Sequence, residues 1–178
     1  MSSTSTIFTP FTEEDLIPKE EKLDVVKKGK TFSIGIPKEP CLNEKRTCII
    51  PDAVQILVTN GHQVIIESGA GLGSHFADIL YSEAGAEITN DPKVAFSQDL
   101  VLKINPPTEE EIDYLRPMTY LISALQINLR DKEYFLKLAC KKVNAIAFEF
   151  IMDEYKQLSL VRLIGEIAGS VSILYASE

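Results

Sequence analysis

The sequence predicts an α/β domain in which a mostly parallel sheet lies between two layers of helices. Two observations predict this fold class. Six segments typical of strands alternate with segments typical of helices from Thr31 to Phe148, and several strands are apolar runs such as Val64-Ile65-Ile66. This alternation is typical of a parallel sheet that is covered on both faces and joined by right-handed crossovers.

The first strand and helix are marked by prolines and a glycine. A strand at 31–36 ends at Pro37, and a helix begins at Pro51, where a first-turn proline loses no hydrogen bond. Asn60-Gly61 ends this helix, because glycine accepts the left-handed cap conformation. Its apolar positions recur at helical spacing: they are Val54, Ile56 and Leu57. A second strand at 63–67 follows.

The middle of the chain contains three shorter elements after a glycine-rich loop at 69–74. We expect a helix at 78–84 closed by Gly85, a strand at 86–89, and a brief helix at 92–96 capped by Asp91. A buried strand at 99–104 then ends at Pro106-Pro107.

The second half begins with a capping box, in which the Thr108 hydroxyl and the Glu111 carboxylate satisfy each other's backbone amides. We expect its helix to end near 115 and the three glutamates at 109–111 to form a solvated first turn. Strands at 119–124 and 144–148 flank a helix at 131–141, and a helix interrupted by two glycines spans 158–177. The inward residues of the helix at 131–141 are Tyr134, Phe135 and Leu138.

Length and local composition divide the chain into three parts. We expect a flexible N-terminal arm at 1–30, a domain at 31–157, and at 158–178 the start of an interdomain or dimerisation helix. The last residues are helix-forming with no stop signal, which indicates a piece of a longer protein. Small residues on that helix would admit another helix from the missing domain or a symmetry mate, so we expect a homo-oligomer; packing on its own sheet is equally compatible. These residues are Gly165, Ala168, Gly169 and Ser172.

Composition excludes several classes of partner. The net charge is −8, from 18 basic and 26 acidic residues, and this disfavours nucleic acid. Cys41, Cys48 and Cys140 lack metal-ligand spacing, so we expect reduced thiols and no metal site. No apolar run reaches the ~18 residues of a membrane span and no signal peptide is present, so we expect no membrane insertion and a cytoplasmic location.

Arg46 is the strongest candidate for ligand binding. It lies in the polar loop Asn43-Glu44-Lys45-Arg46 that follows the first strand. Ligands of open α/β sheets bind outside the carboxyl ends of strands, and a guanidinium binds a carboxylate through two parallel hydrogen bonds. The alternative is a surface arginine paired with Glu44 or Glu39.

Other candidates follow later strands. Lys103 either snorkels at a strand end or faces the same cleft as Arg46, and Asn105 follows it. Gln126 follows the fifth strand and can donate hydrogen bonds to a substrate. His75 is a weak acid–base candidate, and His62 is expected at the surface.

The glycine loop does not predict a dinucleotide site. Gly69, Gly71 and Gly73 follow a strand and precede a helix, but Ser74 stands where the G-x-G-x-x-G fingerprint requires glycine. We expect a tight turn that approaches the cleft, and no cofactor-binding residues in this chain.

Ordered motifs over residues 32–178 resemble the N-terminal domain shared by alanine dehydrogenases and the alpha subunit of proton-translocating NAD(P) transhydrogenases. They are Ile34–Glu39, Asn43–Arg46, Gly61-His62-Gln63-Val64, Glu67–Ser74, Ala84–Ile88, Leu102–Pro107 and Glu166–Gly169. The resemblance implies a flavodoxin-like domain of a two-domain oxidoreductase whose NAD or NADP is bound by a separate Rossmann domain, absent from this chain. It also implies the reaction of L-alanine, NAD and water to pyruvate, ammonia and NADH.

The resemblance also assigns roles to residues. Arg46 matches the arginine that binds the substrate carboxylate, whereas Asn105 and Gln126 stand where alanine dehydrogenases have a substrate-binding lysine and a catalytic histidine. Neither amide can act as a general acid or base at neutral pH, so no residue is assigned as catalytic. Alternatives are therefore a transhydrogenase alpha subunit and, in another class, a non-catalytic binding or interaction domain. The ligand in the leading interpretation is a small 2-oxo acid or amino acid.

Overall fold

The computed structural model describes residues 30–40 and 43–177. Six parallel strands form one sheet with the order β3-β2-β1-β4-β5-β6. This is the doubly wound order 3-2-1-4-5-6, and the predicted fold class, an α/β domain with a mostly parallel sheet between helices, is confirmed. The strands are β1 (Ser33–Ile36), β2 (Gln63–Glu67), β3 (Glu87–Thr89), β4 (Leu100–Leu102), β5 (Tyr120–Ser123) and β6 (Asn144–Ala147).

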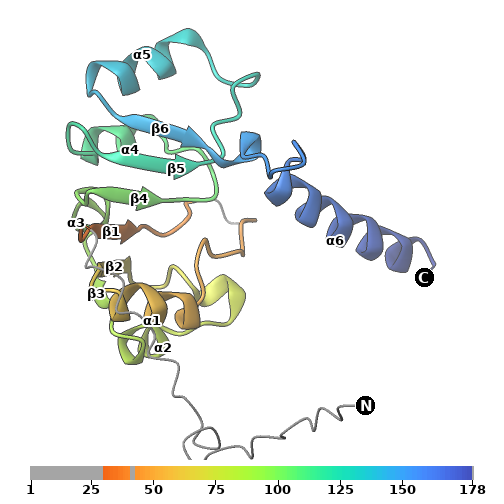
Figure 1. Cartoon of the computed structure of the whole chain (residues 1–178), viewed down its shortest axis with the longest axis horizontal. Coiled ribbons are helices and arrows are strands. Elements are labelled where there is room, and N and C mark those ends of the chain that lie inside the picture. The colour runs from red at the N-terminus through yellow and green to blue at the C-terminus, as the bar shows by residue number, and fades with distance from the viewer. Residues whose placement is uncertain (1–29, 41–42, 178) are drawn as a thin grey trace, which may run out of the picture.

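Helices cover the two faces of the sheet unequally (Figure 1). Helices α1 and α2 pack with β1, β2 and β3 around one apolar cluster, and α3, α4 and α5 pack with β4 and β5 around a second. The helices are α1 (Pro51–Thr59), α2 (Asp78–Glu83), α3 (Pro92–Phe96), α4 (Glu109–Tyr114), α5 (Lys132–Cys140) and α6 (Ser159–Ala176), with 3₁₀ turns η2 (Leu72–Ser74) and η3 (Phe148–Phe150).

A close approach between β1 and α3 explains the glycine in the first strand. A Cβ atom on Gly35 would lie 1.8 Å from the carbonyl oxygen of Ala95. Only glycine therefore lets α3 pack against β1 at this depth. Phe96, which is fully buried, follows Ala95 and joins the second core cluster.

The predicted helix boundaries are largely confirmed. Pro51 begins α1, Gly61 adopts φ 89° after its end, and Thr108 and Glu111 form the capping box of α4. Ile56 is a correction, since its side chain is 63% exposed. The inward face of α1 instead follows the spacing from Val54 to Leu57 and Val58, which pack on the sheet.

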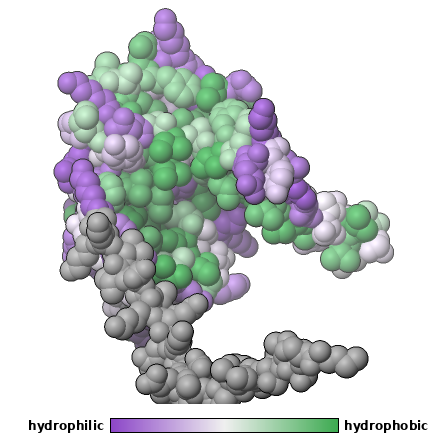
Figure 2. Space-filling view, in the orientation of Figure 1, coloured by the Kyte–Doolittle hydropathy of each residue, from purple (hydrophilic) through white to green (hydrophobic). Residues whose placement is uncertain are grey.

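Helix α6 differs from the prediction in two ways. It is continuous through Gly165 and Gly169, and none of its residues is buried. Beyond its first turns it projects away from the sheet (Figures 1 and 2). The expectation that no segment reaches membrane-span length also needs correction: the 18 residues of α6 have a mean hydropathy of 1.4, so by length and composition alone it could cross a membrane. The arm at 1–29 and Cys41 lie outside the described residues.

Candidate functional site

The candidate site lies where the strand order reverses, between β1 and β4. The segments that follow these two strands meet there, because the backbone amide of Ile104 donates to the Glu39 Oε1 atom at 2.7 Å. In a doubly wound sheet this reversal opens a crevice at the carboxyl ends of the strands. The loop carrying Arg46 borders the same crevice.

Lys103 is buried at this point rather than exposed in the crevice. Its Nζ atom lies 3.4 Å from the Glu39 Oε2 atom and 3.2 Å from the Glu111 Oε1 atom, and its side chain is 0% exposed. The ammonium also lies 5.6 Å from the centre of the Phe96 ring. Lys103 therefore joins β4 to the loop after β1 and to α4. Glu111 is consequently not the solvated residue that the sequence predicted.

Arg46 both borders the crevice and forms an ion pair within its own loop. Its Nε atom donates to the Glu44 Oε1 atom at 2.8 Å, and its Nη2 atom donates to Oε2 at 2.6 Å. These hydrogen bonds hold the pKa of Glu44 below its ordinary value and raise the pKa of Arg46. No acceptor for Nη1 is found among the described residues, and the Arg46 side chain remains 56% exposed.

Asn105 lies between two carboxylates. Its Nδ2 atom is 3.4 Å from the Glu39 Oε2 atom and 3.4 Å from the Glu44 Oε2 atom. Charged and amide groups thus form a continuous path from Arg46 to the buried Lys103. The structure brings together Arg46, Asn105 and Lys103 from segments that are far apart in the sequence.

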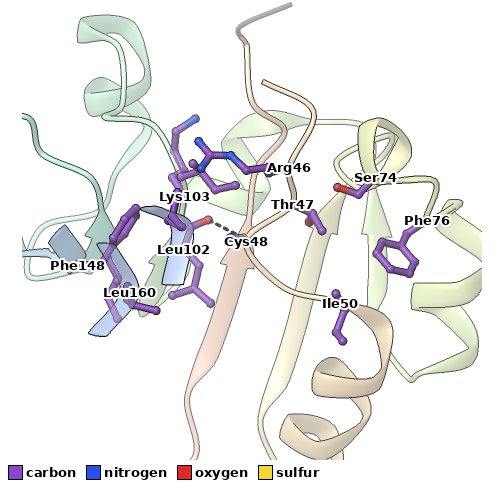
Figure 3. Close-up of a pocket in the computed structure, with 13 residues that line it drawn as sticks. Arg46, Thr47, Cys48, Ile50, Ser74, Phe76, Leu102, Lys103, Phe148 and Leu160 are labelled. Carbon is purple, nitrogen blue, oxygen red and sulfur yellow. Dashed lines mark hydrogen bonds between the residues drawn. The ribbon is translucent and has the colours of Figure 1, made fainter. Parts of the chain in front are cut away.

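The crevice opens into a cavity of about 520 Å³ with an unequal distribution of polar groups (Figure 3). Arg46, Thr47 and Ser74 supply polar side chains to its wall. Much of the remaining lining is apolar, and it comes from β4, β5, η3 and the first turns of α6. These apolar residues are Leu102, Ile122, Phe148, Leu160 and Ile164.

The glycine loop approaches this site as predicted. The Ser74 hydroxyl donates to the Lys45 carbonyl at 2.7 Å, and a Cβ atom on Gly73 would lie 2.7 Å from the same oxygen. A Cβ atom on Gly71 would lie 2.5 Å from the Tyr81 ring. The space beside these glycines is filled by the chain itself, so the loop does not fit the phosphates of a dinucleotide.

Gln126 follows β5 in a left-handed conformation, with φ 49°, and does not line the cavity. Its backbone amide and that of Leu125 donate to the Glu149 Oε1 atom at 2.9 and 2.8 Å. Sequence reasoning missed Glu149. A glutamate between two phenylalanines, directly after an apolar strand, was the available signal.

Neither of the two histidines lines the cavity. His75 is exposed in a left-handed conformation, and His62 accepts a hydrogen bond from the Phe32 amide at 3.2 Å through its Nδ1 atom. Burial raises the pKa of Cys48, in the cavity wall, to about 12. In the part of the chain that the structure describes, no three His, Cys, Asp or Glu residues gather as a metal site would require.

Comparisons with known proteins give a consistent result. The family described as "Alanine dehydrogenase/PNT, N-terminal domain" matches residues 35–168. Alanine dehydrogenase of Staphylococcus saprophyticus is 38% identical over 82% of this chain and 39% of its own length, and that of Bacillus subtilis strain 168 is 40% identical over 78% and 36%. The chain therefore spans well under half the length of these relatives.

Solved structures show the same two groups. An L-alanine dehydrogenase superposes with a TM-score of 0.76 and 34% identity, covering 80% of this chain and 39% of the other. A transhydrogenase from Sinorhizobium meliloti superposes with a TM-score of 0.61 and 31% identity, covering 68% and 36%.

Proposed function

Because this chain belongs to the alanine dehydrogenase/PNT N-terminal domain family, we propose that it is the substrate-side domain of an NAD(P)-dependent oxidoreductase, most closely of the alanine dehydrogenase type. The ligand is a small 2-oxo acid or amino acid. The nicotinamide cofactor is bound by a domain outside this chain, and it accepts or donates the hydride. In the alanine reaction, L-alanine, NAD and water give pyruvate, ammonia and NADH.

The observation that supports this proposal is the position of Arg46. Its guanidinium stands at the carboxyl ends of β1 and β4, beside a cavity large enough for a ligand. Glu44 accepts hydrogen bonds from the Nε and Nη2 atoms of Arg46 and thereby fixes the plane of the guanidinium group. The Nη1 side can then donate to a ligand carboxylate.

The other proposed substrate residues act around Arg46. Asn105, through Glu44, supports the loop that carries Arg46. Lys103 contributes a positive charge that two carboxylates compensate, so it acts on the loops and not directly on the ligand. Gln126 contacts a ligand only where that ligand extends beyond the described cavity.

Calorimetric titration of the 178-residue chain with pyruvate tests the carboxylate site. Arg46→Ala should abolish binding, because its Nη1 group has no acceptor among the described residues, whereas Lys103 in the same wall is buried between two carboxylates. Arg116→Ala is the matched control: the Arg116 side chain is equally exposed, at 56%, and pairs with Asp99 away from the cavity. Equal loss in both variants would refute the proposal.

A second candidate function is non-catalytic ligand binding. It is supported by the described cavity wall, where Cys48 with its pKa of about 12 and the paired Lys103 provide no general acid or base. The complete gene product separates the alternatives. Oxidation of NADH with pyruvate and ammonium supports the dehydrogenase, hydride exchange between NADH and an NADP analogue supports a transhydrogenase alpha subunit, and binding without turnover supports the binding domain.

We further propose that α6 begins the interdomain or dimerisation segment of a cytoplasmic homo-oligomer. Its apolar side chains are strongly exposed, including Ile167 at 67% and Leu174 at 67%. Burial of such a helix against protein removes apolar surface from water. Light scattering of the complete gene product tests the oligomer, and a monomer at all concentrations would refute it.

A further inference from the structure

We propose that the cavity beside Arg46 selects carboxylic acids that carry a branched aliphatic or aromatic tail, rather than the smallest 2-oxo acids. This inference rests on the proposed carboxylate site and adds the class of side chain. It starts from the shape of the cavity, whose volume of about 520 Å³ lies within the range of pockets for drug-sized ligands. Pyruvate would leave most of that space unfilled.

The floor of the cavity is an apolar part of the sheet that none of the helices α1 to α5 covers. Helix α1 packs on the face of β1 and β2 from which Ile34 and Val64 project. Leu102 of β4 lies on the same face and is only half-buried, and Ile122 beside it on β5 is also half-buried. The cavity lies directly beyond the edge of the α1 layer, so a ligand there contacts the sheet itself.

The far wall comes from η3 and α6. Phe148 faces the cavity, and Leu160 and Ile164 follow on successive turns of α6. Phe148 and Leu160 lie beside Leu102, across the cavity from Ser74 and Phe76 (Figure 3). The arrangement pairs the exposed guanidinium of Arg46 with an apolar surface, which is complementary to an acid with an apolar tail.

Calorimetry on the 178-residue chain with pyruvate, 2-oxoisovalerate, 2-oxoisocaproate and phenylpyruvate tests the proposal. Each buried methylene should lower Kd about fourfold. We expect 2-oxoisocaproate to bind at least about tenfold more tightly than pyruvate. The neutral amide of 2-oxoisocaproate should bind weakly, and Arg46→Ala should abolish the binding of the acids.

A pair of tryptophan variants on α6 provides the matched control. Ile164→Trp narrows the cavity and should weaken the binding of 2-oxoisocaproate at least about tenfold. The Kd for pyruvate should change less than about twofold. Ile167→Trp lies on the same helix, outside the cavity wall, and should change neither. Both positions are exposed, at 45% and 67%, so both variants should fold.

The outcomes distinguish this inference from the proposed function. If pyruvate binds through Arg46 and longer tails add nothing, the tail preference is wrong and the carboxylate site stands. If tailed acids and their amide bind equally and independently of Arg46, the cavity is an uncovered apolar surface, and both are wrong. Equal effects of the two tryptophans would also overturn the assignment of the apolar wall.

Discussion

Lys103 and Glu39 form an ion pair across the point where the strand order reverses, with 3.4 Å between the Nζ and Oε2 atoms. Glu39 also accepts the backbone amide of Ile104 through its other oxygen. The Glu39 carboxylate thus joins the end of β4 to the loop that follows β1. Because Glu111 holds the same ammonium from α4, three segments of the chain meet at one buried charge.

Removing that charge should strongly destabilise the domain. Lys103→Met keeps the length of the side chain but leaves two carboxylates buried without compensation, and we expect a loss of about 3–5 kcal/mol in the free energy of unfolding. Urea denaturation followed by circular dichroism measures it. Lys137→Met is the control, since Lys137 pairs with Asp113 at 3.0 Å on the surface and should cost about 1 kcal/mol or less. Similar losses of unfolding free energy in both variants would contradict the conclusion that the buried Lys103 ion pairs stabilise the domain.

Glu44 should act on ligand binding through the orientation of Arg46. Glu44→Gln keeps the size of the side chain but replaces one accepting oxygen with an amide nitrogen, so the two parallel hydrogen bonds cannot both form. We expect the Kd for pyruvate to rise several-fold, because the guanidinium is no longer held in one orientation. Glu83→Gln, on the surface of α2, is the control. Unchanged affinity in Glu44→Gln would mean that Arg46 needs no support from its neighbour.

The same pair should give the domain an acid-sensitive component of stability. The pKa of Glu44 in the folded chain lies below its ordinary value of 4.5, because Arg46 donates hydrogen bonds to the carboxylate. The stabilisation is therefore present above pH 4.5 and is lost as the pH falls through the lowered pKa. Urea midpoints of the wild type and Glu44→Gln should differ at pH 7 and converge near pH 3. A constant difference across this range would contradict the ion pair.

The fold was predictable because its signals are local. Each helix boundary that we predicted correctly depends on residues within a single turn. The residues are Pro51 at the start of α1, Gly61 after its end, and Thr108 with Glu111 at the start of α4. Ile56 was misassigned because helical spacing alone does not say which side of a short helix meets the sheet. The continuity of α6 through Gly165 was missed because two glycines weaken a helix without ending it.

The site was only partly predictable, because its contacts join distant segments. Arg46 was found from its position after a strand, but the sequence left open whether it pairs with Glu44 or faces a cavity, and it does both. That Lys103 is enclosed by Glu39 and Glu111 depends on the placement of α4 over β4. The spacing of apolar residues along the sequence does not show where α4 lies on the sheet.

The two described cysteines should differ strongly in reactivity. Burial raises the pKa of Cys48 to about 12, whereas Cys140 is exposed at the end of α5. Because the thiolate is the nucleophile, iodoacetamide at pH 8 should modify Cys140 much faster than Cys48. Mass spectrometry of digested samples measures the rate at each site. A rate for Cys48 within about twofold of that for Cys140 would show that the cavity wall opens to solvent.

Cys48 should also make stability fall at high pH. A thiol whose pKa is raised on folding favours the native state below the unfolded pKa of about 8.5, and this contribution is lost as the pH rises toward 12. A serine hydroxyl does not ionise in this range, so Cys48→Ser should remove this dependence between pH 8.5 and 10. Parallel curves for the variant and the wild type over that range would contradict the burial of the thiol.

Two glycine-to-alanine substitutions should have opposite effects. Gly35→Ala places a methyl group 1.8 Å from the Ala95 carbonyl oxygen, so α3 must move away from β1. We expect a loss of about 1–3 kcal/mol or more in the free energy of unfolding, measured by urea denaturation. Gly165→Ala meets nothing within 4 Å and lies inside α6, where alanine favours the helix over glycine by about 1 kcal/mol. Hydrogen exchange of α6 amides should therefore slow roughly fivefold, while the urea midpoint should not move, because α6 is not packed in the core. A raised midpoint in Gly165→Ala would show instead that α6 unfolds together with the sheet.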